Sequence, residues 1–160
     1  MFDFCRNTLP LIQARRPQAK LLIVGADPSP AVQKLGELPG VTVTGSVPDV
    51  RPYILRSAAM VAPLNIARGT QNKILEAMAM GVPVVTSPAG AGGVDALDEE
   101  HFLVGDGPAA YAAACLRLME DAGERERLAR AGRERMLSNH DWQASMRRLD
   151  GIIARVVAKN

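Results

Sequence analysis

The sequence has little of several features that would assign it to a familiar class of protein. Only two of its 160 residues are cysteine, 4% are aromatic, and the formal net charge is +2. A small disulfide-stabilised secreted domain carries more cysteine, and a nucleic-acid-binding surface needs a larger excess of basic residues. No apolar run reaches the length of about 18 residues that a membrane-spanning helix needs. The N-terminal segment has its basic residues after its apolar stretch, the reverse of a signal peptide. We therefore expect a cytoplasmic protein with no nucleic-acid partner.

Several chemical motifs are also absent from the sequence. The run Gly25-Ala-Asp-Pro28 follows an apolar segment but lacks GxGxxG, which argues against a dinucleotide-dependent oxidoreductase. There is no GxxxxGK[ST] phosphate loop and no Asp-x-Asp pair to hold a metal–diphosphate complex. Cys5 and Cys115 are far apart and have no histidine at metal-ligand spacing, so we expect both to be reduced core residues. We predict neither a metal nor a cofactor.

Short β-branched and aliphatic runs alternate with longer segments of helical apolar spacing. This alternation predicts one α/β domain over residues 1–160, a Rossmann-like parallel sheet with helices covering both faces. The expected strands are 20–24, 41–44, 58–63, 82–86 and 102–104. The expected helices are 4–14, 30–35, 50–56, 71–80, 108–120, 124–137 and 141–157.

The segment 62–86 is the most informative, because it predicts a strand, a polar loop over 65–70, a helix and a second strand. A helix that begins at the carboxyl end of a parallel strand presents free backbone N–H groups and the positive end of its dipole, which suits a diphosphate. Lys73 and Glu76 share one face of this helix, so they offer a cation for phosphate and a carboxylate for sugar or ribose hydroxyls. An ordinary solvent-exposed ion pair between them is the alternative.

The run Leu75-Glu-Ala-Met-Ala-Met-Gly-Val-Pro-Val-Val85 resembles the signature LEAMAxGxPVV of the GT-B glycosyltransferases of family GT4, the glycosyl transferases group 1. Further matches are Leu21-Leu-Ile-Val-Gly25, Val43-Thr-Gly-Ser-Val-Pro-Asp49 and Phe102-Leu-Val104. The resemblance implies the C-terminal, donor-binding domain of a retaining enzyme that uses a UDP- or GDP-linked sugar in polysaccharide or glycoconjugate biosynthesis. The variant Ala67-Arg-Gly-Thr-Gln-Asn-Lys73 is similar to sugar transferases of bacterial exopolysaccharide systems.

The resemblance also implies roles for individual residues. Glu76 matches the glutamate that contacts the ribose, and Arg68 stands where the family has its other glutamate. We expect Arg68 and Lys73 to stabilise the departing diphosphate as the catalytic residues. The expected substrate-binding residues are Gly25, Ser46, Val47, Pro48, Gly69, Thr70, Asn72 and Glu76. In the family, the glycine-containing segment that corresponds to 89–94 closes near the donor sugar, and a flexible connector is the alternative for it here.

Aligned on the family pattern, the chain begins in the first helix of the donor domain and lacks the strand before it. Either the remaining strands close the gap, or another segment or a second copy fills it. The resemblance implies that an N-terminal GT-B domain binds the acceptor, so we expect this chain alone to be inactive. Arg68 in place of glutamate leaves open a non-catalytic nucleotide-sugar-binding or scaffolding module. The basic residues of the last helix, Arg147, Arg148, Arg155 and Lys159, leave open a weak contact with an anionic membrane.

Overall fold

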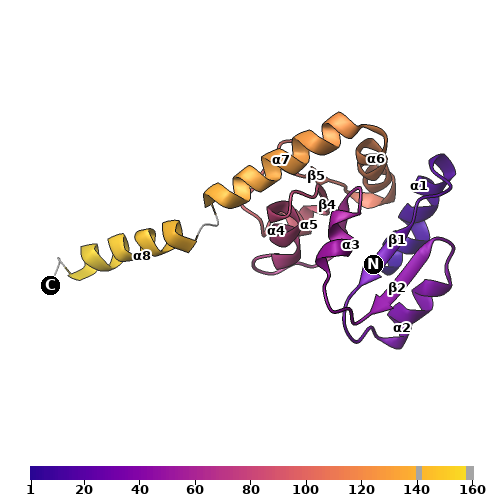
Figure 1. Ribbon diagram of the computed structural model, residues 1–160, viewed down its shortest axis with the longest axis horizontal. Coiled ribbons are helices and arrows are strands. Elements are labelled where there is room, and N and C mark those ends of the chain that lie inside the picture. Colours follow the sequence, from indigo (N-terminus) through magenta and orange to yellow (C-terminus); the bar gives the residue numbers. More distant parts are fainter. Residues whose placement is uncertain (140–141, 158–160) are drawn as a thin grey trace.

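The computed structural model describes residues 1–139 and 142–157, and it has an α/β fold in which every strand pairs in parallel (Figure 1). All five predicted strands are present, with boundaries within three residues of those expected. The predicted first residue of the last helix, Asp141, lies outside the described residues. The elements in chain order are η1 (Phe4–Thr8), α1 (Leu9–Arg15), β1 (Leu21–Val24), α2 (Pro30–Gln33), η2 (Lys34–Glu37), β2 (Val41–Gly45), α3 (Arg51–Leu55), β3 (Met60–Ala62), α4 (Asn72–Ala79), β4 (Val84–Thr86), α5 (Pro88–Ala91), β5 (Leu103–Val104), α6 (Gly107–Glu120), α7 (Ala122–Asn139) and α8 (Trp142–Val157).

The strands form two sheets rather than one. β1 pairs with β2, so that Leu21 lies opposite Val41. β4 is the middle strand of the second sheet, in which Val85 lies opposite Val61 of β3 and Leu103 of β5. Across the described residues no pairing joins the two sheets, so β1 and β3 each keep an unpaired edge. The expectation that the remaining strands close into one sheet is therefore wrong.

The second sheet is covered on both faces, as a buried parallel sheet requires. Val84 and Val85 of β4 are fully buried and point to opposite faces. Val85 belongs to the core cluster that contains residues of η1, α1 and α6, whereas Val84 belongs to the cluster formed with α4 and α7. Thr86 completes the strand, and its buried hydroxyl donates a hydrogen bond to the carbonyl oxygen of Ala62 at 3.2 Å.

The first sheet is covered on one face only, which corrects the expectation that helices cover both faces. Leu21 and Val41 are buried in the same cluster as η1 and α1, and Leu35 of η2 joins them. Leu22 points to the opposite face and is 41% exposed, and its register partner Thr42 is exposed as well. The helices that pack on this sheet thus lie on the Leu21 side, and an aliphatic side chain of β1 faces solvent on the other.

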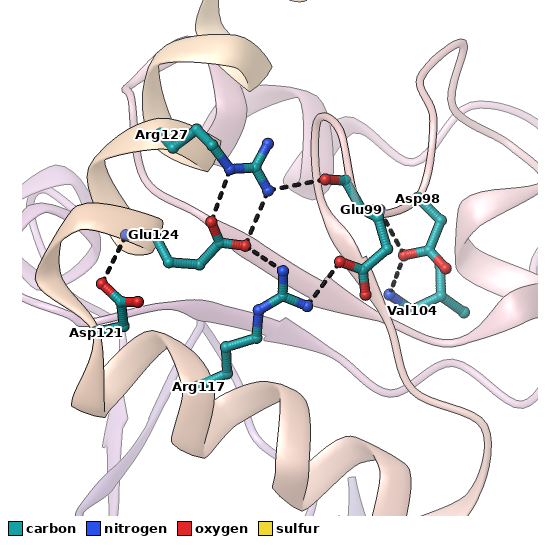
Figure 2. Close-up of polar contacts among 7 residues, drawn as sticks. All are labelled: Asp98, Glu99, Val104, Arg117, Asp121, Glu124 and Arg127. Carbon is teal, nitrogen blue, oxygen red and sulfur yellow. Dashed lines mark hydrogen bonds and ion pairs between the residues drawn. The ribbon is translucent and has the colours of Figure 1, made fainter.

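An ion network fastens the loop before β5 to α6 and α7. Figure 2 shows the Arg117 guanidinium between two carboxylates, donating to Glu99 at 2.6 Å and to Glu124. Arg127 donates from Nε to Glu124 at 2.7 Å and from Nη2 to the backbone oxygen of Glu99 at 2.8 Å. The hydrogen bond from Arg127 holds the pKa of Glu124 below its ordinary value. α6, α7 and the loop over 98–100 are therefore joined by charged side chains as well as by the core.

The last helix stands apart from this body. In Figure 1, α8 extends away from the sheets and from the helices that cover them. Among the described residues, no helix is both long enough and apolar enough to cross a bilayer.

Candidate functional site

The start of α4 presents charged side chains that pair with no other side chain among the described residues. Arg68, Lys73 and Glu76 are exposed, and within the described residues their side chains make no hydrogen bond or ion pair. The Lys73–Glu76 ion pair, which was the alternative for these residues, is therefore not formed. No side chain caps the helix, because the amide of Gln71 turns back and donates to the carbonyl oxygen of Gly69 at 3.1 Å. The first turn of α4 thus keeps N–H donors and charged side chains available to a ligand.

The glycine-containing segment after β4 is a support for this site rather than a flexible connector. It forms the short helix α5, whose N-cap Ser87 accepts a hydrogen bond from the backbone N–H of Gly90 at 3.2 Å. A Cβ on Gly90 would overlap with the Thr86 hydroxyl, and a Cβ on Gly93 would overlap with the carbonyl oxygen of Gly69. These glycines are needed for contacts within the protein. Two of them hold the segment 88–93 against β4 and against the loop that leads into α4.

A cavity of about 410 Å³ opens at the carboxyl ends of β3, β4 and β5. Ligands of parallel α/β sheets bind at this end of the strands. Its polar lining comes from the segments that follow the three strands and from the N-terminal turn. It includes Asp3, Asn65, Ser87 and Asp106, together with the buried Thr8 and Tyr111. Tyr111 donates from its hydroxyl to the carbonyl oxygen of Val85 at 2.9 Å.

None of the ten predicted site residues lines this cavity. The cavity instead contains Asn65, at the start of the predicted loop, together with polar residues that the sequence did not single out, among them Asp3, Ser87 and Asp106. The sequence could have indicated two of them, because polar residues just after a predicted strand lie at the end of the sheet where ligands bind. Ser87 directly follows β4 and Asp106 lies two residues after β5. Asp3 had no such signal, because only the packing of η1 under the sheet brings it to this end.

The remaining predicted residues lie at the carboxyl end of the first sheet. Val24 is opposite Gly45 in the β1–β2 register, so Gly25 and Ser46 follow neighbouring strands. Gly25 is exposed, and no protein atom lies within 4 Å of the position a Cβ would take. Ser46 and Pro48 are exposed and Val47 is half-buried. In the described structure no hydrogen bond links these residues to the group around α4.

The turn after these residues is fixed by one charged pair. Asp49 accepts a hydrogen bond from the backbone N–H of Arg51 at 2.9 Å and another from its Nε at 2.9 Å. These hydrogen bonds hold the pKa of the Asp49 carboxyl below its ordinary value. The segment 46–48 is thus anchored between β2 and the first turn of α3.

The two cysteine thiols and the one described histidine are buried in the protein interior. Cys5 and Cys115 are buried and free, as predicted, and burial raises the pKa of the Cys115 thiol to about 12. The His101 ring is buried and accepts a hydrogen bond on Nδ1 from the backbone N–H of Leu97 at 3.0 Å. Within residues 1–139 and 142–157, no three His, Cys, Asp or Glu side chains are grouped so that they could hold a metal ion.

Comparison with known proteins gives a consistent result. The model of the family described as glycosyl transferases group 1 matches residues 1–121. A D-inositol 3-phosphate glycosyltransferase of Salinispora tropica is 33% identical over 114 residues, which are 70% of this chain and 23% of that protein.

Solved structures with the same fold include a sucrose-phosphate synthase from Thermosynechococcus elongatus, with a TM-score of 0.75 and 26% identity over all of this chain and 44% of that one. The Anabaena protein HepE, solved with UDP and glucose, has a TM-score of 0.74 and 15% identity, and the match covers 91% of this chain and 43% of HepE. At that identity the likeness to HepE concerns the fold alone. The chain spans less than half the length of each of these three proteins.

Proposed function

The chain belongs to the glycosyl transferases group 1 family, and from this premise we propose that it is the nucleotide-sugar-binding domain of a retaining glycosyltransferase. The donor is a nucleoside diphosphate sugar, UDP- or GDP-linked, and the product is a polysaccharide or another glycoconjugate. The observation that carries this proposal is the group of unpaired charges, Arg68, Lys73 and Glu76, around the uncapped start of α4.

Each of these groups has a task that fits its chemistry. The diphosphate lies at the first turn of α4, where the backbone N–H groups of Asn72 and Lys73 and the side chains of Lys73 and Arg68 oppose its charge. These cations act in catalysis by stabilising the negative charge that develops on the departing diphosphate. Glu76 accepts hydrogen bonds from the ribose hydroxyls, and Gly69 and Thr70 let the backbone approach the ligand.

Two neighbouring surfaces take the other parts of the donor. The base lies at the end of the first sheet, against Ser46, Val47 and Pro48, where the open space around Gly25 admits it. The cavity at the ends of β3, β4 and β5 takes the sugar, because carboxylate and amide oxygens such as those of Asp106 and Asn65 accept hydrogen bonds from hydroxyls. A uridine nucleotide is supported by the fold that the chain shares with HepE, which was solved with UDP and glucose.

The acceptor is proposed to bind to a further domain of a longer protein, because the chain spans 44% of the sucrose-phosphate synthase it matches. The same longer protein would complete the sheet. Met1 lines the cavity at the carboxyl end of the strands, which is where a parallel strand leading into Met1 would end. Such a strand would pair with the unpaired edges of β1 and β3. A strand from a second copy, giving a homodimer, is the other source.

Calorimetric titration of the purified chain with UDP, GDP and ADP tests the donor site. We expect saturable binding of one nucleotide that weakens at least tenfold, or about 1.4 kcal/mol, in both Lys73→Ala and Glu76→Ala. Arg130→Ala is the matched control, because Arg130 is an exposed cation on α7, outside the proposed site. If none of the three nucleotides binds, or if the control weakens binding equally, the proposed site is wrong.

The other candidate function is a non-catalytic binding or scaffolding module, favoured by Arg68 in the position of the family's first glutamate. Binding alone cannot separate the two, so transfer must be measured on the longer protein. In a catalytic protein, Arg68→Ala should abolish sugar transfer there. Nucleotide binding without transfer by the longer protein would establish the module instead.

A further inference from the structure

The side chain of Gln71 holds two consecutive carbonyl groups of the loop that leads into α4. Its Nε2 donates to the carbonyl oxygen of Gly69 at 3.1 Å and to that of Arg68 at 3.4 Å. The Gly69 oxygen is also enclosed from a second direction, since it occupies the position where a side chain on Gly93 would begin. Both carbonyl oxygens therefore point toward Gln71, and one of them also points toward Gly93.

This arrangement fixes the direction of two backbone N–H groups. The C=O and N–H of a trans peptide point in opposite directions, and no peptide bond of the described residues is cis. The N–H of Gly69 belongs to the same peptide as the Arg68 carbonyl, and the N–H of Thr70 to the same peptide as the Gly69 carbonyl. Both N–H groups therefore point away from Gln71. Residues 68–70 are exposed, and neither N–H donates a hydrogen bond within the described structure.

We propose that Gln71 is the positioning residue of the diphosphate site, and that it aims the N–H groups of Gly69 and Thr70 at the phosphates. This role rests on the proposed function and extends it, because it adds two donors to those of the first turn of α4. A carbonyl oxygen turned toward the ligand would repel a diphosphate, whereas successive backbone N–H groups on one side attract an anion. Gln71 touches no part of the donor and acts through the backbone.

A second glutamine of the protein makes the same pair of contacts far from this site. Gln13 of α1 donates from Nε2 to the carbonyl oxygens of Ala19 at 3.2 Å and of Pro39 at 3.1 Å. These residues precede β1 and β2, so the contacts lie at the amino end of the first sheet. Both glutamines are half-buried. Gln13→Met is therefore the matched control for Gln71→Met, since each variant replaces the amide donor with an apolar side chain of similar length.

Titration of the whole 160-residue chain with UDP, GDP and ADP is the first measurement, and the nucleotide that binds is then compared with its nucleoside, which has no phosphate. We expect Gln71→Met to lower the affinity for the nucleotide roughly tenfold and to leave the affinity for the nucleoside within about twofold. A general loss of order in the site would weaken both. Gln13→Met should bind both ligands like the unaltered chain, and urea denaturation confirms that the two variants are folded.

Amide NMR spectra provide a signature that a merely structural role would not produce. In the unaltered chain and in Gln13→Met, the amide protons of Gly69 and Thr70 should move downfield when the nucleotide is added, because they then donate to charged phosphate oxygens. In Gln71→Met this shift should be lost, although the nucleotide still binds through its base and Lys73.

The outcomes separate this role of Gln71 from the proposed function. Absence of nucleotide binding by the unaltered chain overturns both. If the unaltered chain binds a nucleotide and Lys73→Ala weakens that binding, the proposed function stands. The role of Gln71 is then refuted by any of three results: nucleotide binding by Gln71→Met as tight as that of the unaltered chain, an equal loss of nucleoside binding, or amide protons of Gly69 and Thr70 that do not respond to the nucleotide.

Discussion

Gly93 lies directly against the carbonyl oxygen of Gly69, with no room for a side chain, since a Cβ on Gly93 would overlap with that oxygen. The contact joins the segment after α5 to the loop that leads into α4. Gly69 itself has a φ of +65°, a conformation that favours glycine. The loops that follow β3 and β4 therefore hold each other in place, and this contact also positions the start of α4.

Gly93→Ala tests this support. The added methyl group should displace the loop over 65–70 and weaken nucleotide binding by roughly tenfold, about 1.4 kcal/mol, in a calorimetric titration. The control is Gly92→Ala, whose Cβ would meet its nearest neighbour, the carbonyl oxygen of Pro88, at an ordinary 3.7 Å. Equal binding by the two variants would show that the position of this loop does not govern the site.

This contact also shows what the sequence could not supply. The strands were predictable because their β-branched runs are buried, Val84 and Val85 completely so. α5 was not, because a segment of alternating alanine and glycine has no apolar periodicity, and its order comes from the Ser87 cap and from Gly69 across the loop. A local sequence pattern predicts an element whose own apolar residues are buried. It does not predict an element such as α5, which is held in place by contacts with residues elsewhere in the sequence.

The same distinction applies to the candidate site, of which one part could be predicted from the sequence and the other could not. The uncapped start of α4 was predictable from a loop and a helix within one continuous segment. The cavity was not, because Asp3 and Asp106 reach it from the positions just before η1 and α6, about a hundred residues apart in the sequence. The split of the sheet had only an indirect sign, the strand that the family pattern leads one to expect.

Gly132→Ala should destabilise the packing of α7 on the body. A Cβ at this position would lie 2.9 Å from the carbonyl oxygen of His101 and 3.4 Å from Cε of Met78. Because the backbone at His101 is fixed in the core, we expect the free energy of unfolding to fall by about 1–3 kcal/mol in urea denaturation. Gly151→Ala in α8 has open space around it and should leave this free energy unchanged or raise it slightly. A loss of stability at Gly151 but not at Gly132 would contradict the packing described here.

Glu124→Gln should weaken the ion network of Figure 2. The substitution removes the charge that Arg117 and Arg127 share, and because both arginines are partly exposed we expect a loss of about 1 kcal/mol or less at neutral pH. The pKa of Glu124 is lowered in the folded state, so its contribution is present above the ordinary value of 4.5 and is lost as the pH falls through the lower, folded value. Urea denaturation near neutral pH and in acid should show the difference from the unaltered chain shrinking. Glu126 is exposed and has no hydrogen-bond or ion-pair partner in the described structure, so Glu126→Gln should show no such difference.

Cys115 should make the protein less stable in alkali. Burial raises the pKa of its thiol from 9.0 to about 12, so the folded state holds the proton over a range in which the unfolded chain releases it. Stability is therefore complete below about pH 9 and falls as the pH rises toward 12, by up to about 1.4 kcal/mol per pH unit. Cys115→Ala removes this proton, so it should unfold with a smaller dependence on pH in that range, even though the small cavity it leaves lowers stability at neutral pH. Some dependence should remain, because burial also raises the pKa of Tyr111. Urea denaturation of both proteins across this range gives the two slopes, and identical slopes would mean that the Cys115 thiol is not protected in the folded protein.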